Sequence, residues 1–110
     1  MNITVTEENN VSVMCVSGRM DATNSADFDK AAKELLSEGR QRILLNLGAL
    51  EFISSAGLRV VLIMGKSCQE KKLALAFCDL QPMVAEIFSI SSFDTIFKIF
   101  KNKDEALNNM

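Results

Sequence analysis

The apolar run at residues 43–47 restricts the fold more than any other part of the chain, and Asn46 is its single polar residue. Successive side chains of a β-strand point to opposite faces of the sheet, so both faces of this strand must be covered. Residues 73–77 are apolar throughout. Strands of this kind lie inside a parallel sheet that helices cover, and the chain is therefore expected to have an α/β fold.

Strand and helix patterns alternate along the rest of the chain. Residues 3–7 and 11–17 predict two strands joined by a turn at Asn9 and Asn10. Amphipathic spacing predicts helices at residues 25–37 and 55–69 and a third helix that begins near Pro82. A loop with a strand-like segment is expected after residue 93, followed by a short last helix. A chain of 110 residues is expected to form one domain, residues 1–110, with a mixed four- to five-stranded sheet whose centre is parallel and which packs against helices.

Three loops are expected to meet at one edge of this sheet. Right-handed crossovers make the second, third and fourth strands parallel, so their carboxyl ends gather there. The loops span residues 19–24, 48–55 and 79–81. Proteins with α/β folds usually carry their functional residues at this edge. The polar side chains expected on this one surface are Asp21, Asn24, Ser54, Ser55 and Asp79.

Two adjacent serines, Ser54 and Ser55, lie where the third strand leads into a helix. The first backbone N–H groups of a helix have no partner along the helix, and this end carries a partial positive charge. A serine hydroxyl is suited to capping such an end, and a phosphate is stabilised there for the same reason. The residues alone leave both interpretations open.

The face of the helix that carries Ser55 is expected to be exposed. At about 100° per residue, the side chains of Arg59, Leu62 and Lys66 lie close to Ser55, and Ile63 lies at the border. The opposite side, which carries the valines at positions 60 and 61 and Met64, is expected to pack in the core. An exposed leucine among polar and basic residues is typical of a protein contact surface, although single exposed leucines are common.

The composition excludes most catalytic designs. The chain has no histidine, so it has no Ser-His-Asp or Cys-His machinery and no histidine-ligated metal. Its three cysteines match no metal or redox spacing and are interpreted as small buried hydrophobes in a reducing compartment. No glycine-rich phosphate loop is present. We expect neither enzyme activity, nor a cofactor, nor a metal; a serine hydrolase would need a base other than histidine.

Charge and hydropathy also limit the partners. The net charge of −2 does not favour binding to nucleic acid or to an anionic membrane. No apolar run reaches the ~18–20 residues of a membrane span, and the first residues do not resemble a signal peptide. The protein is therefore expected to be cytoplasmic.

Four segments together resemble the STAS domain family of bacterial anti-sigma factor antagonists, and the resemblance covers nearly the whole chain. The most specific is Phe-Ile-Ser-Ser-Ala-Gly-Leu at residues 52–58. The others, which occur in the matching order, are Val-Ser-Gly-Arg-Met-Asp at 16–21, Ile-Leu-Leu-Asn-Leu at 43–47 and Phe-Asp-Thr-Ile-Phe-Lys-Ile at 93–99.

The resemblance implies a phosphorylation switch. Ser55 takes the place of the phosphorylated serine, and an ATP-dependent anti-sigma factor serine kinase is its implied partner. The unphosphorylated antagonist binds that kinase and frees a sigma factor, and a serine phosphatase resets the cycle. The free protein is expected to be a monomer. The expected contact residues are Asp21, Asn24, Ser54, Ser55, Arg59, Leu62, Ile63 and Lys66.

Three residues depart from the family pattern. Ser54 stands where relatives usually have aspartate, so Ser54 is a second candidate for phosphorylation. Asn46 replaces an aspartate that is common near the end of the third strand, and Arg59 stands at a position that is often glycine. Arg59 is one helical turn from Ser55 and could pair with a phosphate there. An alternative function is a STAS interaction module of a larger assembly or transporter, without a phosphorylation cycle.

Overall fold

The computed structural model describes residues 1–110 and contains five strands and five helices. The strands are β1 (Asn2–Glu8), β2 (Val11–Met20), β3 (Arg42–Ile53), β4 (Ala74–Cys78) and β5 (Lys98–Phe100). The helices are α1 (Ser25–Ser37), α2 (Ser55–Glu70), α3 (Pro82–Ile90), α4 (Phe93–Ile96) and α5 (Lys103–Asn109).

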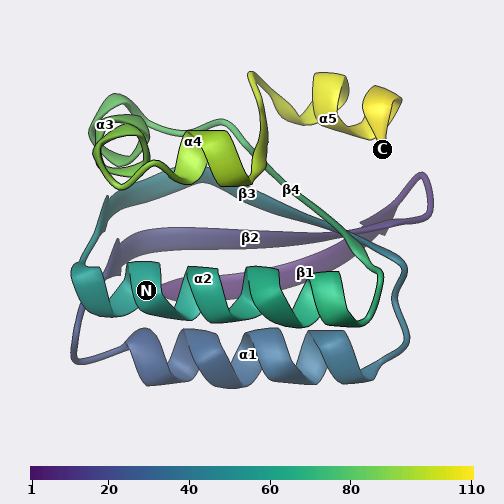
Figure 1. Cartoon of the computed structure of the whole chain (residues 1–110), viewed down its shortest axis with the longest axis horizontal. Coiled ribbons are helices and arrows are strands. Elements are labelled where there is room, and N and C mark those ends of the chain that lie inside the picture. The colour runs from purple at the N-terminus through teal and green to yellow at the C-terminus, as the bar shows by residue number, and fades with distance from the viewer.

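All strands belong to one sheet, in the order β1-β2-β3-β4-β5 (Figure 1). The β1–β2 hairpin is antiparallel, whereas β2, β3, β4 and β5 are parallel to one another. The predicted α/β fold with a mixed sheet and a parallel centre is therefore confirmed.

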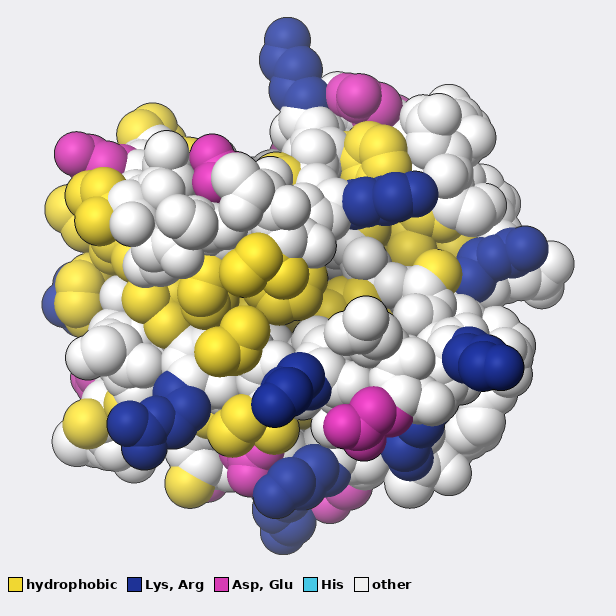
Figure 2. Space-filling view, in the orientation of Figure 1, with side chains coloured by type: hydrophobic (Ala, Val, Ile, Leu, Met, Phe, Trp, Pro, Cys, Tyr) yellow, Lys and Arg dark blue, Asp and Glu magenta, His cyan; other side chains and the backbone are white.

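Both faces of the sheet are packed, which explains why β3 is apolar on both sides. Ile43 and Leu45 belong to the larger core, to which α1, α2, α3 and α4 contribute side chains. Leu44, between them, belongs to a smaller core that Ala106 of α5 closes from the other face. Helices α1 and α2 lie side by side along the sheet (Figure 1), and a band of hydrophobic side chains remains visible between α2 and the α3–α4 layer (Figure 2).

Strands β2 and β3 are longer than predicted. The sequence predicts that β2 ends before Gly18 and that residues 48–54 form a loop, and both predictions are wrong. The two strands stay paired through Met20 and Ile53, with bulges that absorb two register shifts. Gly18 has a φ of +90°, which glycine adopts without strain. Leu50 and Ile53 are fully buried, so burial holds this part of β3 in the sheet.

Four phenylalanine rings fix the segment after α3. This segment was predicted as a loop with a strand-like end, and it contains helix α4 and strand β5. Phe77 of β4 contacts Phe88 of α3 at 5.5 Å and Phe97 at 5.1 Å between ring centroids. Phe93 of α4 contacts both Phe88 and Phe97 at 5.5 Å. The Phe77–Phe97 pair is tilted and the other three pairs are edge-on, which is a favourable arrangement of aromatic side chains.

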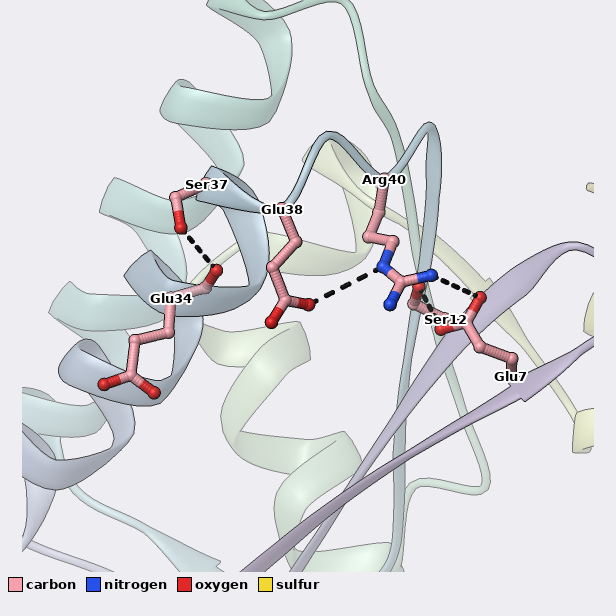
Figure 3. Close-up of polar contacts among 6 residues, drawn as sticks. All are labelled: Glu7, Ser12, Glu34, Ser37, Glu38 and Arg40. Atoms are coloured by element: carbon pink, nitrogen blue, oxygen red, sulfur yellow. Dashed lines mark hydrogen bonds and ion pairs between the residues drawn. The ribbon is translucent and has the colours of Figure 1, made fainter.

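A polar network joins β1, β2 and the α1–β3 connection near the amino end of β3 (Figure 3). The Arg40 guanidinium pairs with Glu7 at 3.2 Å and with Glu38 at 3.6 Å. The buried Ser12 hydroxyl donates a hydrogen bond of 2.6 Å to the other oxygen of Glu7. The network lies near the C-terminal end of α1, whereas the Asp21–Asn24 turn lies at its N-terminal end. We therefore assign the network a structural role.

Candidate functional site

Ser54 connects β3 to α2 and is held from both sides. Its backbone N–H donates to the carbonyl of Met20 at 2.8 Å, which ties it to the end of β2. Its hydroxyl accepts a hydrogen bond from the backbone N–H of Gly57 at 3.3 Å and so caps α2. Ser54 is half-buried, and its hydroxyl has a structural task.

Ser55 is the first residue of α2 and is exposed. No hydrogen bond engages its hydroxyl, in contrast to that of Ser54. Gly57 packs so closely behind it that an added Cβ would lie 2.8 Å from both Ile53 Cγ1 and Met20 Sδ. The first turn of α2 is therefore packed tightly against the ends of β2 and β3, and the hydroxyl of Ser55 is free and faces solvent.

The turn after β2 lies beside this helix start. The Asn24 side chain accepts from the backbone N–H of Asp21 at 2.9 Å and donates to the carbonyl of Arg19 at 2.8 Å. Asn24 occupies the N-cap position of α1, but its side chain closes the turn and makes no cap bond to α1. Since Met20 also binds Ser54, the turn and the serines are neighbours.

Hydrogen bonds keep the Asp21 carboxyl ionised. The hydroxyl and the backbone N–H of Thr23 donate to the same Asp21 oxygen at 2.6 and 2.9 Å. These bonds lower the pKa of Asp21 below its usual value, with the Thr23 hydroxyl as the largest cause. A fixed negative charge therefore lies beside the α2 N-terminus.

Asp79 does not belong to this surface, although it was predicted there. Its Cβ lies 3.3 Å from the position of an added Cβ on Gly48, and the Gln81 side chain donates to the Gly48 carbonyl at 2.8 Å. Gly48 precedes Ser54 by six residues of β3, and six residues of strand span ~20 Å. The prediction was wrong because β4 ends opposite Asn46, whereas β2 and β3 continue.

The exposed face of α2 carries the predicted residues. Arg59, Leu62, Ile63 and Lys66 are all exposed, and Leu62 and Ile63 retain 41% and 45% of their accessible surface. The core side of the helix, with its two valines and Met64, is buried as predicted. The face therefore combines the free serine, two basic side chains and two large apolar ones.

Arg19 and Phe52 form a contact that the sequence did not reveal. The Arg19 guanidinium lies over the Phe52 ring at 4.6 Å from its centroid, a favourable cation–π distance. The two residues are partners in the β2–β3 register beyond the second bulge. Neither residue type nor spacing signals the pair, because the bulges decide which positions face each other.

The structure offers no cluster of three or more His, Cys, Asp or Glu side chains that could hold a metal ion. None of its helices combines the length and the hydrophobicity needed to cross a bilayer.

The cysteines are expected to differ in reactivity. Burial raises the pKa of the Cys68 thiol to about 11 and that of Cys78 to about 12, and a hydrogen bond with Asp79 adds to the second shift. Because thiolates are the reactive form, an alkylating reagent at pH 8 should modify the half-buried Cys15 first. Mass spectrometry of the native protein over time measures the order of modification, with the urea-unfolded protein as control. Equal rates of modification for all three thiols in the native protein would contradict this prediction.

The same shifts give a direction for stability against pH. In the unfolded chain these thiols ionise near their ordinary pKa of 9.0, whereas in the folded protein they stay protonated well above it. The unfolded state therefore loses protons first, and the free energy of unfolding should decrease as the pH rises above about 9.

Comparisons with known proteins agree on one family. A family model described as the STAS domain matches residues 2–106. BtrV of Bordetella bronchiseptica, described as a candidate anti-sigma factor antagonist, is 33% identical over 106 residues, which cover 96% of this chain and 91% of that protein. The anti-sigma F factor antagonist of Paenibacillus polymyxa is 30% identical over 114 aligned residues, covering 100% and 97%.

A solved structure shows the same fold. A crystal structure of a candidate anti-sigma factor antagonist from Thermotoga maritima superimposes with a TM-score of 0.91 at 24% identity, covering 97% of this chain and 92% of that one.

Proposed function

The chain belongs to the STAS domain family, and from this premise we propose that it is an anti-sigma factor antagonist that phosphorylation of Ser55 switches off. Two relatives of at least 30% identity carry descriptions of this kind. The observation that supports the switch best is the free, exposed hydroxyl of Ser55 at the N-terminus of α2. It lies next to a serine whose own hydroxyl is already used as the cap.

In this proposal the unphosphorylated protein binds an anti-sigma factor serine kinase and thereby releases the sigma factor. The protein acts in the cytoplasm and is a monomer before it binds the kinase. The contact surface consists of the turn after β2 and the exposed face of α2, that is Asp21, Asn24, Ser54, Ser55, Arg59, Leu62, Ile63 and Lys66.

The kinase, which brings ATP, transfers the γ-phosphoryl group to the Ser55 oxygen. The hydroxyl proton leaves, a phosphoester forms and ADP departs. A serine phosphatase hydrolyses the ester with water and returns the serine and inorganic phosphate. In this proposal the catalytic groups for both steps belong to the kinase and the phosphatase.

The phosphorylated serine can be accommodated without unfolding. The phosphate adds about −1.5 to −2 charge at a helix end that favours anions. Arg59 is four residues further along the exposed face and can pair with it. The cap bond of Ser54 is untouched. The switch therefore acts by placing charge in the contact surface, beside Leu62 and Ile63, and leaves the core unchanged.

A phosphorylation assay tests the proposal. The protein is incubated with its cognate anti-sigma factor kinase and ATP, and its intact mass should rise by one phosphate. Ser55→Ala should abolish the increase. Ser54→Ala is the matched control: it should still be phosphorylated, although the lost cap destabilises it by about 1 kcal/mol.

Two results would count against the proposal. An unchanged mass in the wild-type protein would contradict the phosphorylation switch. A mass increase that persists in Ser55→Ala would assign the phosphorylation to another residue. The alternative, an interaction module of a larger assembly without a phosphorylation cycle, requires that Ser55→Asp leaves partner binding intact.

A further inference from the structure

A groove of about 450 Å³ lies between the C-terminal half of α2 and the segment that joins α4 to β5. Its walls and floor include Leu62, Lys66, Leu73, Ile96, Phe97 and Lys98. This α2–β5 groove shares Leu62 and Lys66 with the proposed contact surface, but it extends to the edge strand of the sheet, where no contact residue was predicted.

The walls of the groove are preformed. The Phe97 ring packs directly on α2 at Gly65, where an added Cβ would overlap the ring. From the other side, Phe77 and Phe93 contact Phe97 at 5.1 and 5.5 Å between centroids. Phe97 therefore cannot swing into the groove and fill it, and the groove needs no rearrangement to accept a ligand.

The two rims are apolar. Leu62 on α2 and Ile96 on α4 keep 41% and 58% of their accessible surface. These residues line the same groove, and the band of hydrophobic side chains between α2 and the α3–α4 layer is visible in Figure 2. Contiguous exposed apolar surface rimmed by polar residues is typical of interaction sites.

The charged residues that line the groove have one sign. Lys66 and Lys98 line it, one from each wall, and no Asp or Glu does. This contrasts with the whole chain, whose net charge is −2. An apolar ligand with carboxylates on its flanks matches this arrangement, whereas a basic ligand would be repelled.

Resting on the proposed function, we infer that the α2–β5 groove binds an acidic amphipathic segment of the anti-sigma factor. Apolar side chains of that segment enter between Leu62 and Ile96, and its carboxylates pair with Lys66 and Lys98. Ser55 precedes Lys66 by 11 residues of α2, or ~16 Å of helix. The groove is thus a second contact, away from the switch, and its contribution to binding should add to that of Ser55.

Affinity measurements with the cognate anti-sigma factor test this contact. Ile96→Ser and Lys98→Glu should each raise the Kd about tenfold, which corresponds to loss of one well-buried interface side chain. Ile90→Ser and Lys101→Glu are matched controls, because both side chains are exposed and outside the groove. The controls should stay within about twofold of wild type, and thermal unfolding verifies that all four variants fold.

A titration with defined peptides tests the chemistry without the anti-sigma factor. ¹⁵N-labelled protein is titrated with a synthetic helical Leu/Glu peptide, with the same peptide carrying Lys in place of Glu, and with dodecanoate. The amide signals of Gly65 and Lys98 should shift with the Leu/Glu peptide alone. An equal response to the Lys peptide, or stronger binding of dodecanoate, would overturn the assignment of an acidic segment.

The outcomes separate the two proposals. If wild-type protein binds the anti-sigma factor and the Ile96 and Lys98 variants bind equally well, the groove contact is wrong while the proposed function stands. If wild-type protein does not bind the anti-sigma factor but the Leu/Glu peptide shifts the groove signals, the proposed function is wrong while the ligand chemistry of the groove stands.

Discussion

Phosphorylation of Ser55 is expected to weaken binding to the cognate anti-sigma factor about a thousandfold, or ~4 kcal/mol. The phosphate would lie in the middle of the contact surface, one helical turn from Arg59 and near the exposed Leu62. Docking would have to strip water from a doubly charged group, which costs several kcal/mol unless the partner supplies matching donors. Isothermal titration calorimetry of the unmodified and phosphorylated proteins measures the difference.

Variants separate charge from the loss of the hydroxyl. Ser55→Asp, which adds one charge, should weaken binding about a hundredfold, whereas Ser55→Ala should stay within a few-fold of wild type. Ser89→Asp is the matched control, because Ser89 is exposed on α3, outside both proposed contacts; its Kd should not change. If Ser55→Asp binds as tightly as Ser89→Asp, the alternative of an interaction module without a switch is favoured.

The sequence predicted the core strands because burial on two faces leaves a simple pattern. Ile43 and Leu45 pack in one core and Leu44 in the other, and no exposed strand would have this composition. The ends of β2 and β3 were missed because glycines at positions 18 and 48 indicate breaks locally, while pairing and burial of Leu50 override them. The misplacement of Asp79 followed from this error.

The candidate site was predictable only in part. Two neighbouring serines before a helix fit both a cap and a phosphate acceptor, and only three-dimensional contacts show that Ser54 is bonded and Ser55 free. The α2–β5 groove could not be predicted, because it depends on Phe97 packing against Gly65, two residues with no local relationship in sequence.

Phe77→Ala is expected to lower the free energy of unfolding by about 3–5 kcal/mol, as for other fully buried phenylalanines. The Phe77 side chain is fully buried, and its ring joins β4 to both α3 and Phe97. Truncation leaves a cavity at the centre of the aromatic cluster, which the surrounding rings cannot fill without leaving their rotamers. Urea unfolding followed by circular dichroism gives the difference, provided that the slope of the transition is unchanged.

Phe52→Ala is the matched control, because it removes the same atoms from a half-buried ring at the surface. Its cost should be ~1 kcal/mol, from partial burial and the lost contact with Arg19. Equal costs for the two variants would show that the aromatic cluster does not anchor α3, α4 and β5. If the cluster does anchor them, Phe77→Ala also loosens the wall formed by Phe97, so the amide signals of Gly65 and Lys98 should shift in this variant and remain unchanged in Phe52→Ala.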